Sequence, residues 1–198
     1  MAEFGLIVSV GIKNLVRLKE LVEADKTLPA LATEMANIHF DQIMHLTCKI
    51  DILTGKIKTY GTSSPRLKRL QTMPGVGPIG AMTIETFAPD MTTFKSGRNF
   101  AAWLWLIPLQ KSTGGKSRLG QITKMGQKDI RRALVIGAMS RIAGHARQGS
   151  RAEPWLQDKL DRKPKMVAAV ALANKMARQI WAMITKNEVY KIEKIIVS

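Results

Sequence analysis

The sequence is poor in the residues that build cross-linked or metal-bound proteins. Its 198 residues include one cysteine, Cys48, and three histidines, at positions 39, 45 and 145. A single cysteine excludes a disulfide framework and a four-cysteine zinc site, and the three histidines do not have the spacing of metal ligands. The acidic residues are few and dispersed, so they do not form the carboxylate cluster that holds paired divalent metals. We therefore expect no metal site and no cofactor in this chain.

Long apolar runs are missing as well. No run approaches the ~18 residues that a membrane-spanning helix needs, and the richest one, MVAAVALA, is closed by Asn174 and Lys175. The N-terminus also lacks the succession of basic, apolar and small residues that marks a secretory signal. These absences favour a cytoplasmic protein that does not contact a membrane.

Positive charge is what the sequence has in excess. Lysine and arginine outnumber aspartate and glutamate by 31 to 15, which gives a formal net charge of +16 and an isoelectric point near 10.3. Because 45% of the residues are hydrophobic, the chain can bury a core and is not a disordered basic tail. Such a balance in a folded chain indicates a polyanionic partner, with nucleic acid as the leading candidate.

Apolar residues recur at helical spacing throughout, and no strand pattern of useful length is found, so the predicted class is all-α. In residues 1–62 one helix ends before Pro29, and a second runs from near Ala30 to about Lys58. The second helix carries apolar residues spaced four, three and four apart, as in a short coiled coil: Leu46, Ile50, Leu53 and Ile57. A hairpin packed on itself and a dimerising coiled-coil arm both remain open for this region.

The turn-rich segment GTSSP, residues 61–65, predicts a boundary to a compact helical domain over residues 63–190. In this domain Ser96 is a candidate N-cap for a helix that ends at Pro108. A second helix is expected over residues 129–147, a short one near Pro154, and a long one follows it. Small residues on the last helix predict close helix packing.

Residues 65–87 place a Pro-Gly-x-Gly hairpin between two short helical patterns. They resemble the helix-hairpin-helix motif of DNA-binding proteins, in which glycines such as Gly75 and Gly77 let backbone N–H groups approach a phosphate. Contacts of this kind position a duplex without reading its bases. An ordinary turn between two antiparallel helices is the alternative.

The segment over about residues 110–128 is a basic loop rich in hydroxyls and glycines, KSTGGKSRLGQITKMGQK from Lys111 onward, and it leads into a helix. Together with the hairpin and the last helix, KPKMVAAVALANKMARQIWAM, this loop forms a set of motifs that is specific to one family. Over about residues 65–185 the chain resembles the C-terminal, serine-bearing domain of a family of insertion-sequence transposases, also described as bridge-RNA-guided recombinases. Full-length members of that family join an N-terminal RuvC-like domain with four metal-binding carboxylates to a coiled-coil arm and this domain.

The resemblance implies that Ser112 attacks a DNA phosphate and holds the strand as a phosphoserine ester. Thr113 is the alternative nucleophile and Ser117 a more distant one. A serine hydroxyl is a weak nucleophile, so it must be aimed, and the developing oxyanion needs cations and backbone N–H groups. The residues expected to contact nucleic acid are Gly75, Gly77, Lys111, Lys116, Arg118, Lys124, Lys128, Arg131 and Arg132.

Two residues depart from the family pattern just before the proposed nucleophile. Trp105 stands where relatives usually have glycine, and Leu109 replaces a residue that is often basic. A tryptophan in a tight slot is expected to overpack it by about 1–3 kcal/mol. We therefore expect Trp105 and Leu109 to alter the geometry of the loop that carries Ser112.

The resemblance also assigns divalent metal, such as Mg²⁺, to the RuvC-like domain, whose carboxylate cluster this sequence does not contain. We expect a truncated transposase that binds DNA, with guide RNA as a further candidate partner, and that does not transpose alone. Its partners would be a second copy or a full-length transposase. Two alternatives remain: a non-enzymatic helix-hairpin-helix module that binds nucleic acid or inhibits a full-length transposase, and a helical RNA-binding protein of ribosomal type. The latter explains the charge but not the Ser-Thr-Gly-Gly loop.

Overall fold

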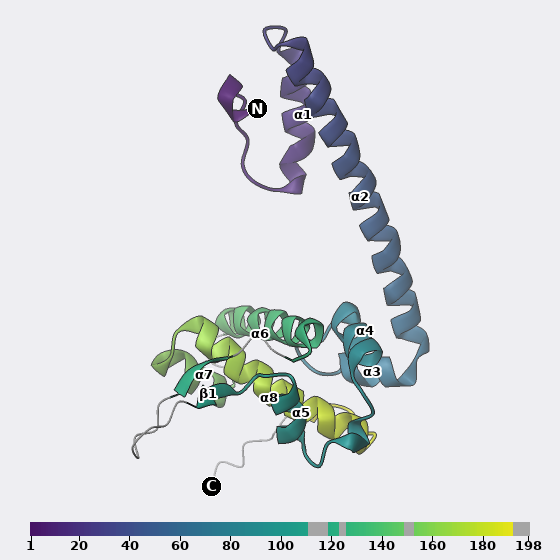
Figure 1. The fold of residues 1–198 in the computed structure, drawn as a ribbon, viewed down its shortest axis with the longest axis vertical. Coiled ribbons are helices and arrows are strands. Elements are labelled where there is room, and N and C mark those ends of the chain that lie inside the picture. Colours follow the sequence, from purple (N-terminus) through teal and green to yellow (C-terminus); the bar gives the residue numbers. More distant parts are fainter. Residues whose placement is uncertain (111–118, 123–125, 149–152, 192–198) are drawn as a thin grey trace. The chain divides into compact units, whose positions relative to one another are not determined.

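The computed structural model describes residues 1–110, 119–122, 126–148 and 153–191. This part of the chain is predominantly helical, which confirms the predicted all-α class (Figure 1). The chain divides into two compact units, Met1–Lys56 and Ile57–Ser198. The division falls inside the long helix α2 (Ala30–Ser63), which also contains the boundary expected after residue 62.

The first unit is a helical hairpin with a small core. Two short 3-10 turns, Ala2–Phe4 and Ile12–Asn14, precede α1 (Leu15–Ala24), and Pro29 then accepts the first backbone hydrogen bonds at the start of α2. Val22 on α1 packs with Ala36 and Phe40 on α2, and this contact buries all three side chains. In the first unit α1 and this end of α2 therefore form a helical hairpin. Apolar residues pack around the contact: Met1, Leu6, Leu15, Leu18 and Leu28.

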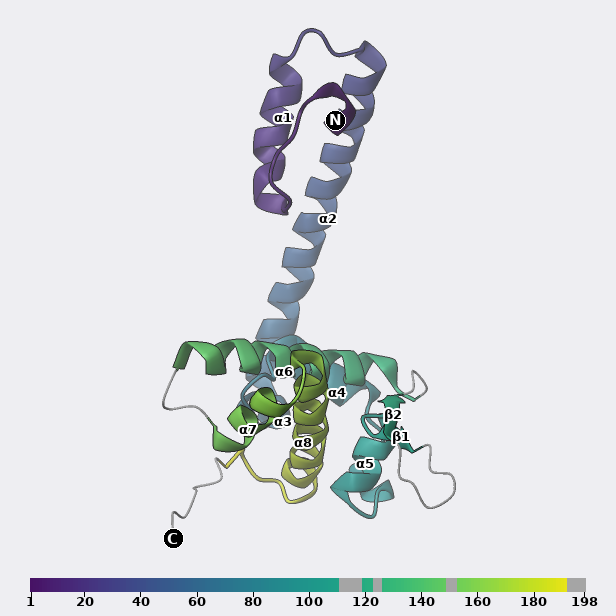
Figure 2. The same cartoon turned by 90° about the vertical axis from the view of Figure 1, so that its left-hand side faces the viewer.

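In the second unit the described helices gather around α8 (Lys165–Thr185), which packs against α3, α5, α6 and α7. Figure 2 shows α6 running across α8. Small residues on α8, including Ala169, Ala173 and Ala177, are fully buried, so neighbouring backbones come close. The other elements are α3 (Pro65–Gln71), α4 (Pro78–Phe87), a 3-10 turn (Met91–Thr93), α5 (Gly97–Trp103), β1 (Pro108–Gln110), β2 (Leu119–Ile122), α6 (Lys128–Gln148) and α7 (Pro154–Arg162).

Helix α2 runs past the end expected near Lys58, and the turn that follows it lies within GTSSP, at Ser64. Helix α2 continues through Gly61 to Ser63, because Gly61 is buried against α3 and its carbonyl oxygen accepts a hydrogen bond from Gln71 Nε2 at 3.3 Å. The chain turns only at Ser64. The Ser64 hydroxyl oxygen caps α3 by accepting a hydrogen bond from Leu67 N at 3.4 Å, and Pro65 occupies the first helical position.

The end predicted for α5 is wrong. Ser96 is the N-cap as expected, since its hydroxyl oxygen accepts a hydrogen bond from Asn99 N. However, α5 ends at Trp103 rather than at Pro108, because Trp105 adopts a positive φ of 53° that no α-helix accommodates. Two unpredicted short strands follow, β1 and β2, paired antiparallel with Gln110 opposite Leu119. They are too short to show the alternation by which strands are recognised.

Candidate nucleic-acid interface

The positive charge lies almost wholly in the second unit. Residues 1–56 contain six lysines and arginines against seven acidic residues, a net charge of −1, whereas residues 57–198 contain 25 against eight, a net charge of +17. A polyanion is therefore attracted to the second unit and not to the first. The hairpin, the basic loop and α6 all belong to this unit.

The turn between α3 and α4, residues 72–77, is held from inside by two apolar side chains. Met73 and Val76 are buried in the core, and Val76 N donates a hydrogen bond to Met73 O at 3.0 Å. These anchors fix the path of the backbone between the helices. As a result, the two glycines of the turn occupy defined and different positions.

Gly75 is required by packing. Its φ is +88°, in the region that favours glycine, and a Cβ added there would lie 2.5 Å from the carbonyl oxygen of Gly137 on α6. Gly137 has the reciprocal restriction, since a Cβ on it would collide with Gly75 O. The pair lets the hairpin touch α6 backbone to backbone. The sequence predicts that Gly75 lets a phosphate approach the backbone. In the structure it is the backbone of α6 that approaches Gly75 closely.

Gly77 has open space around it. It is exposed, its φ of −86° is ordinary, and no atom lies within 4 Å of the position that a Cβ would take. It occupies the N-cap position of α4, with Pro78 at the first helical position, and its carbonyl accepts the first helical hydrogen bond, from Ala81 N. The partial positive charge of the helix N-terminus therefore faces solvent at Gly77, with room for a phosphate.

Helix α6 presents two of the predicted cations to solvent. Gln127 Oε1 caps the helix by accepting hydrogen bonds from Asp129 N at 2.6 Å and Ile130 N at 3.0 Å. Lys128 and Arg132 are both exposed. Since they are four residues apart, they lie on the same face of the helix, one turn from each other.

Arg131 has a different position from its neighbour. It is half-buried, and its Nη1 donates a hydrogen bond to Leu104 O at 3.2 Å, while Asn174 Nδ2 on α8 donates to Leu106 O at 3.3 Å. Both side chains hold the turn between α5 and β1. Arg131, predicted as a nucleic-acid contact, thus has at least one nitrogen engaged in holding this turn.

The same turn contains Trp105, where the resemblance of the sequence leads us to expect glycine. The residue is half-buried with φ 53°, and its ring packs directly on Gly126, whose φ is +80°. A Cβ on Gly126 would collide with the Trp105 ring and lie 2.5 Å from Trp103 O. The tryptophan is accommodated because Gly126 leaves it space, at the cost of an unfavourable backbone conformation.

The remaining predicted site residues lie outside the described residues: Ser112, Thr113, Ser117, Lys111, Lys116, Arg118 and Lys124. The paired residues Gln110 and Leu119 flank residues 111–118 in the chain. The proposed nucleophile thus stays a prediction, as do its cations.

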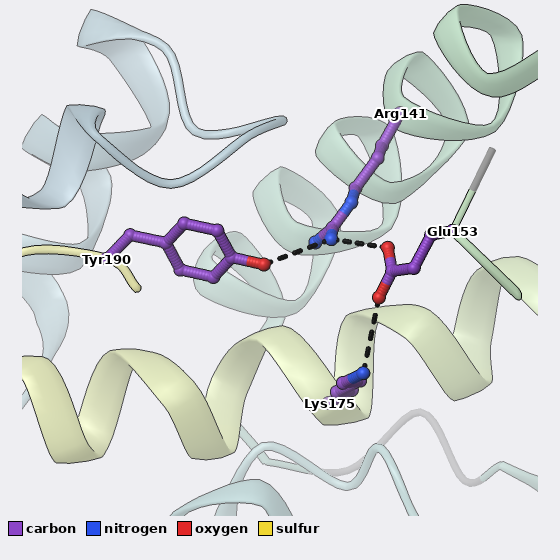
Figure 3. Close-up of polar contacts among 4 residues, drawn as sticks. All are labelled: Arg141, Glu153, Lys175 and Tyr190. Atoms are coloured by element: carbon purple, nitrogen blue, oxygen red, sulfur yellow. Dashed lines mark hydrogen bonds and ion pairs between the residues drawn. The ribbon is translucent and has the colours of Figure 1, made fainter. Parts of the chain in front are cut away.

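Sequence reasoning missed a polar cluster that joins four segments of the second unit (Figure 3). Arg141 Nη2 on α6 contacts Glu153 Oε2 at 2.5 Å and donates to Tyr190 Oη at 3.1 Å, and Lys175 Nζ on α8 contacts Glu153 Oε1 at 3.2 Å. The side chains of Arg141 and Lys175 are only 11% and 13% exposed. Glu153 thereby pairs with two cations that would otherwise count towards a binding surface. The contacts join residues far apart in the chain, so no local pattern in the sequence indicates them.

Neither a metal centre nor a membrane segment is found among the residues that the structure describes. No three histidine, cysteine, aspartate or glutamate side chains within those ranges gather to hold a metal ion. None of the helices in the same ranges is long and apolar enough to span a membrane.

Comparison with known proteins matches the hairpin, the basic loop and α6 to one family. Residues 67–153 match the model of the transposase IS116/IS110/IS902 family. The chain is 42% identical over 193 residues to a protein of Sinorhizobium fredii that bears the name "Putative transposase y4pF/y4sB". The match covers 96% of this chain and 49% of the relative.

Two further relatives are named as transposases of insertion sequence elements. The chain is 34% identical to the transposase of IS1328 from Yersinia enterocolitica, over 96% of this chain and 57% of the relative. It is 28% identical to the transposase of IS1111A from Coxiella burnetii, over 96% and 53%. The chain thus spans about half the length of the relatives it matches.

Proposed function

We propose that this chain is the DNA-binding part of a transposase, because residues 67–153 match the model of the transposase IS116/IS110/IS902 family. The observation that carries the proposal is that the match to the family model and the excess of positive charge lie in the same unit. The family domain lies in the unit with a net charge of +17, while the other unit is close to neutral. A unit that binds a sugar-phosphate backbone needs an excess of cations to neutralise the phosphates.

In the proposed interface, Gly77 receives one phosphate at the N-terminus of α4, and Lys128 and Arg132 contact the backbone from α6. These contacts neutralise phosphates and set the position of a duplex without reading its sequence. The same surface would accept the backbone of a guide RNA, because both polymers offer phosphates to the same groups.

The proposed reaction uses Ser112, with Thr113 as the alternative. The hydroxyl oxygen loses its proton and attacks a DNA phosphorus, a phosphoserine ester forms, and the bridging oxygen of the broken strand leaves and takes up a proton. Lysine and arginine around the loop would stabilise the additional negative charge of the transition state. We propose that divalent metal, such as Mg²⁺, acts in a RuvC-like domain of full-length relatives rather than in these residues.

A pair of glycine variants tests the interface. Gly77→Ala is expected to keep the fold, because the new Cβ meets open space, and to weaken duplex binding by obstructing the phosphate. Gly75→Ala is expected to lower the unfolding free energy by about 2 kcal/mol or more, since its Cβ meets the Gly137 backbone and its φ is positive. Thermal unfolding and equilibrium DNA binding are measured on both variants.

Unchanged DNA affinity of Gly77→Ala, in a protein as stable as the wild type, would remove the α4 N-terminus from the interface. Equal loss of stability in the two variants would contradict the different environments of Gly75 and Gly77.

The nucleophile is tested by trapping. The chain is combined with the metal-binding half of a relative and a nicked DNA substrate, and a covalent protein–DNA adduct is expected on denaturing gels. The adduct should disappear in Ser112→Ala and persist in Ser117→Ala. An adduct that persists in Ser112→Ala and is lost in Thr113→Val would move the nucleophile by one residue.

The alternative of a non-enzymatic binding module or transposase inhibitor predicts the same DNA affinity with no adduct under any of these conditions. The Gly77→Ala result and the trapping result are therefore separate tests of binding and of chemistry.

A further inference from the structure

Helix α6 has two opposite faces, and Figure 2 shows the helix along one edge of the second unit. The face that packs into the core consists of residues four positions apart that are at most 3% exposed: Ile130, Leu134, Ala138 and Ile142. Exposed residues recur with the same spacing but two positions earlier, and two positions turn an α-helix by about 200°. They form the outer face of α6: Lys128, Arg132, Ile136 and Ser140.

The outer face combines positive charge with one large apolar side chain. Ile136 is 59% exposed, and it lies one helical turn from Arg132 and two turns from Lys128. The sequence of α6 contains a single acid, Asp129, which is half-buried in the first turn. Isoleucine is β-branched and a poorer helix former than alanine, so helix propensity does not explain its presence at an exposed position. The outer face is therefore cationic at one end and apolar at its centre, without a carboxylate.

The lengths of these side chains suit a helix that lies in a groove of duplex DNA. From Lys128 to Ile136 the helix rises by about 12 Å, which is close to the width of the major groove of about 12 Å. Lysine and arginine are long and reach outward to the phosphates that line the groove. Isoleucine and serine are short, so they contact only what lies directly against the helix, and in a major groove this is the edges of the bases.

We propose that α6 lies in the major groove of DNA and that Ile136 packs against the C5-methyl group of thymine. This methyl group is the apolar feature that a base edge presents in the major groove, and an aliphatic side chain removes it from water. Lys128 and Arg132 hold phosphates beside it, while the Ser140 hydroxyl donates to or accepts from a neighbouring base edge. The inference rests on the proposed function, DNA binding by this unit, and adds a contact that distinguishes bases.

The contact also distinguishes DNA from RNA. The phosphate contacts proposed at Gly77, Lys128 and Arg132 are available to both polymers, because phosphates carry no sequence information. An A-form RNA helix has a deep, narrow major groove that side chains do not read, and uracil lacks the methyl group of thymine. The outer face of α6 therefore takes duplex DNA, and an RNA duplex gains nothing from Ile136.

Removal of the thymine methyl group tests the contact. An alternating A·T duplex and the same duplex with uracil in place of every thymine carry equal charge and the same base-pairing groups. The wild-type full chain is expected to bind the thymine duplex about fourfold more tightly, which is the gain from burying roughly one methyl group. Ile136→Ala is expected to bind the two duplexes equally.

Ile52 provides the matched control. It is 53% exposed on α2, in the unit with a net charge of −1, and Ile52→Ala makes the same chemical change there. This variant is expected to keep the preference of the wild type for thymine. Thermal unfolding checks the fold of Ile136→Ala, which the substitution is expected to preserve because alanine favours an exposed helical position. The salt dependence of binding by Ile136→Ala should stay as in the wild type, since no phosphate contact is lost.

Equal affinity of the wild type for the two duplexes would overturn the inference. A preference for thymine that survives in Ile136→Ala, or that disappears in Ile52→Ala, would overturn it as well. These outcomes leave DNA binding by the second unit intact. A wild type without affinity for either duplex, in contrast, would contradict the proposed function and this inference with it.

Discussion

Trp105 adopts a backbone conformation that is unfavourable for a residue with a side chain. A non-glycine residue at φ 53° costs about 1–2 kcal/mol, because its Cβ approaches the following carbonyl. The ring is packed on Gly126, and Arg131 and Asn174 hold the carbonyls on either side of it. The surrounding structure thus imposes a conformation that the residue itself disfavours.

A comparison of two small residues at this position isolates the backbone strain. Trp105→Gly and Trp105→Ala both remove the ring, but only glycine adopts the positive φ without strain. We expect Trp105→Gly to be more stable than Trp105→Ala by about 1 kcal/mol, although glycine usually loses more conformational entropy on folding. Urea unfolding of the two variants measures this difference. An alanine variant at least as stable as the glycine variant would show that the turn relaxes and stores no strain.

The glycines of the hairpin mark how far the sequence predicts the site. The Pro-Gly-x-Gly pattern correctly indicated a tight turn between two helices. It did not indicate that Gly75 contacts Gly137, because that contact joins residues far apart in the chain and neither flanking sequence records it. A glycine needed for a phosphate and a glycine needed for packing have the same letter in the sequence.

At the scale of elements, helical periodicity predicted most of the helices, and the errors occur where a tertiary contact overrides it. Helix α2 runs past its expected end near Lys58 because Gly61 packs on α3, and α5 stops early because Trp105 turns the chain. The strands β1 and β2 are stabilised by pairing with each other rather than by a pattern within either strand. Such contacts are not visible in a local window of sequence.

The polar cluster of Arg141, Glu153, Lys175 and Tyr190 links α6, α7, α8 and the C-terminal segment. Glu153 contacts two cations whose side chains are nearly buried, so its removal takes a counter-charge away from each of them. Glu153→Gln is therefore expected to lower the unfolding free energy by about 2–3 kcal/mol. Chemical denaturation measures the loss.

Asp158, five residues further along α7, supplies the control. It pairs with Arg162 at the surface, where an ion pair contributes at most about 0.5 kcal/mol. Asp158→Asn is expected to leave the unfolding free energy almost unchanged. Equal effects from the two substitutions would show that the Glu153 contacts do not stabilise the fold.

At the scale of the whole molecule, charge separates the two units more clearly than sequence length or composition does. The net charge of +16 describes the chain, but the unit that contains the match to the transposase family has +17 and the other unit −1. The first unit instead exposes large aliphatic residues on α2, among them Leu46, Ile50 and Leu53. We therefore expect the second unit, and not the first, to bind nucleic acid.

The salt dependence of duplex binding tests this division most directly, using two matched pairs of substitutions in the full chain. Lys128 and Arg132 on α6, and Lys13 and Arg17 in the first unit, are all exposed, and each pair is one lysine and one arginine four residues apart. Replacement of either pair by glutamine removes the same charge. Each lost phosphate contact lowers the slope of log affinity against log salt by about 0.9. The account predicts a steep slope for the wild type, a slope shallower by about 1.8 for Lys128→Gln with Arg132→Gln, and an unchanged slope for Lys13→Gln with Arg17→Gln. A flat slope for the wild type, or equal changes from the two pairs, would contradict it.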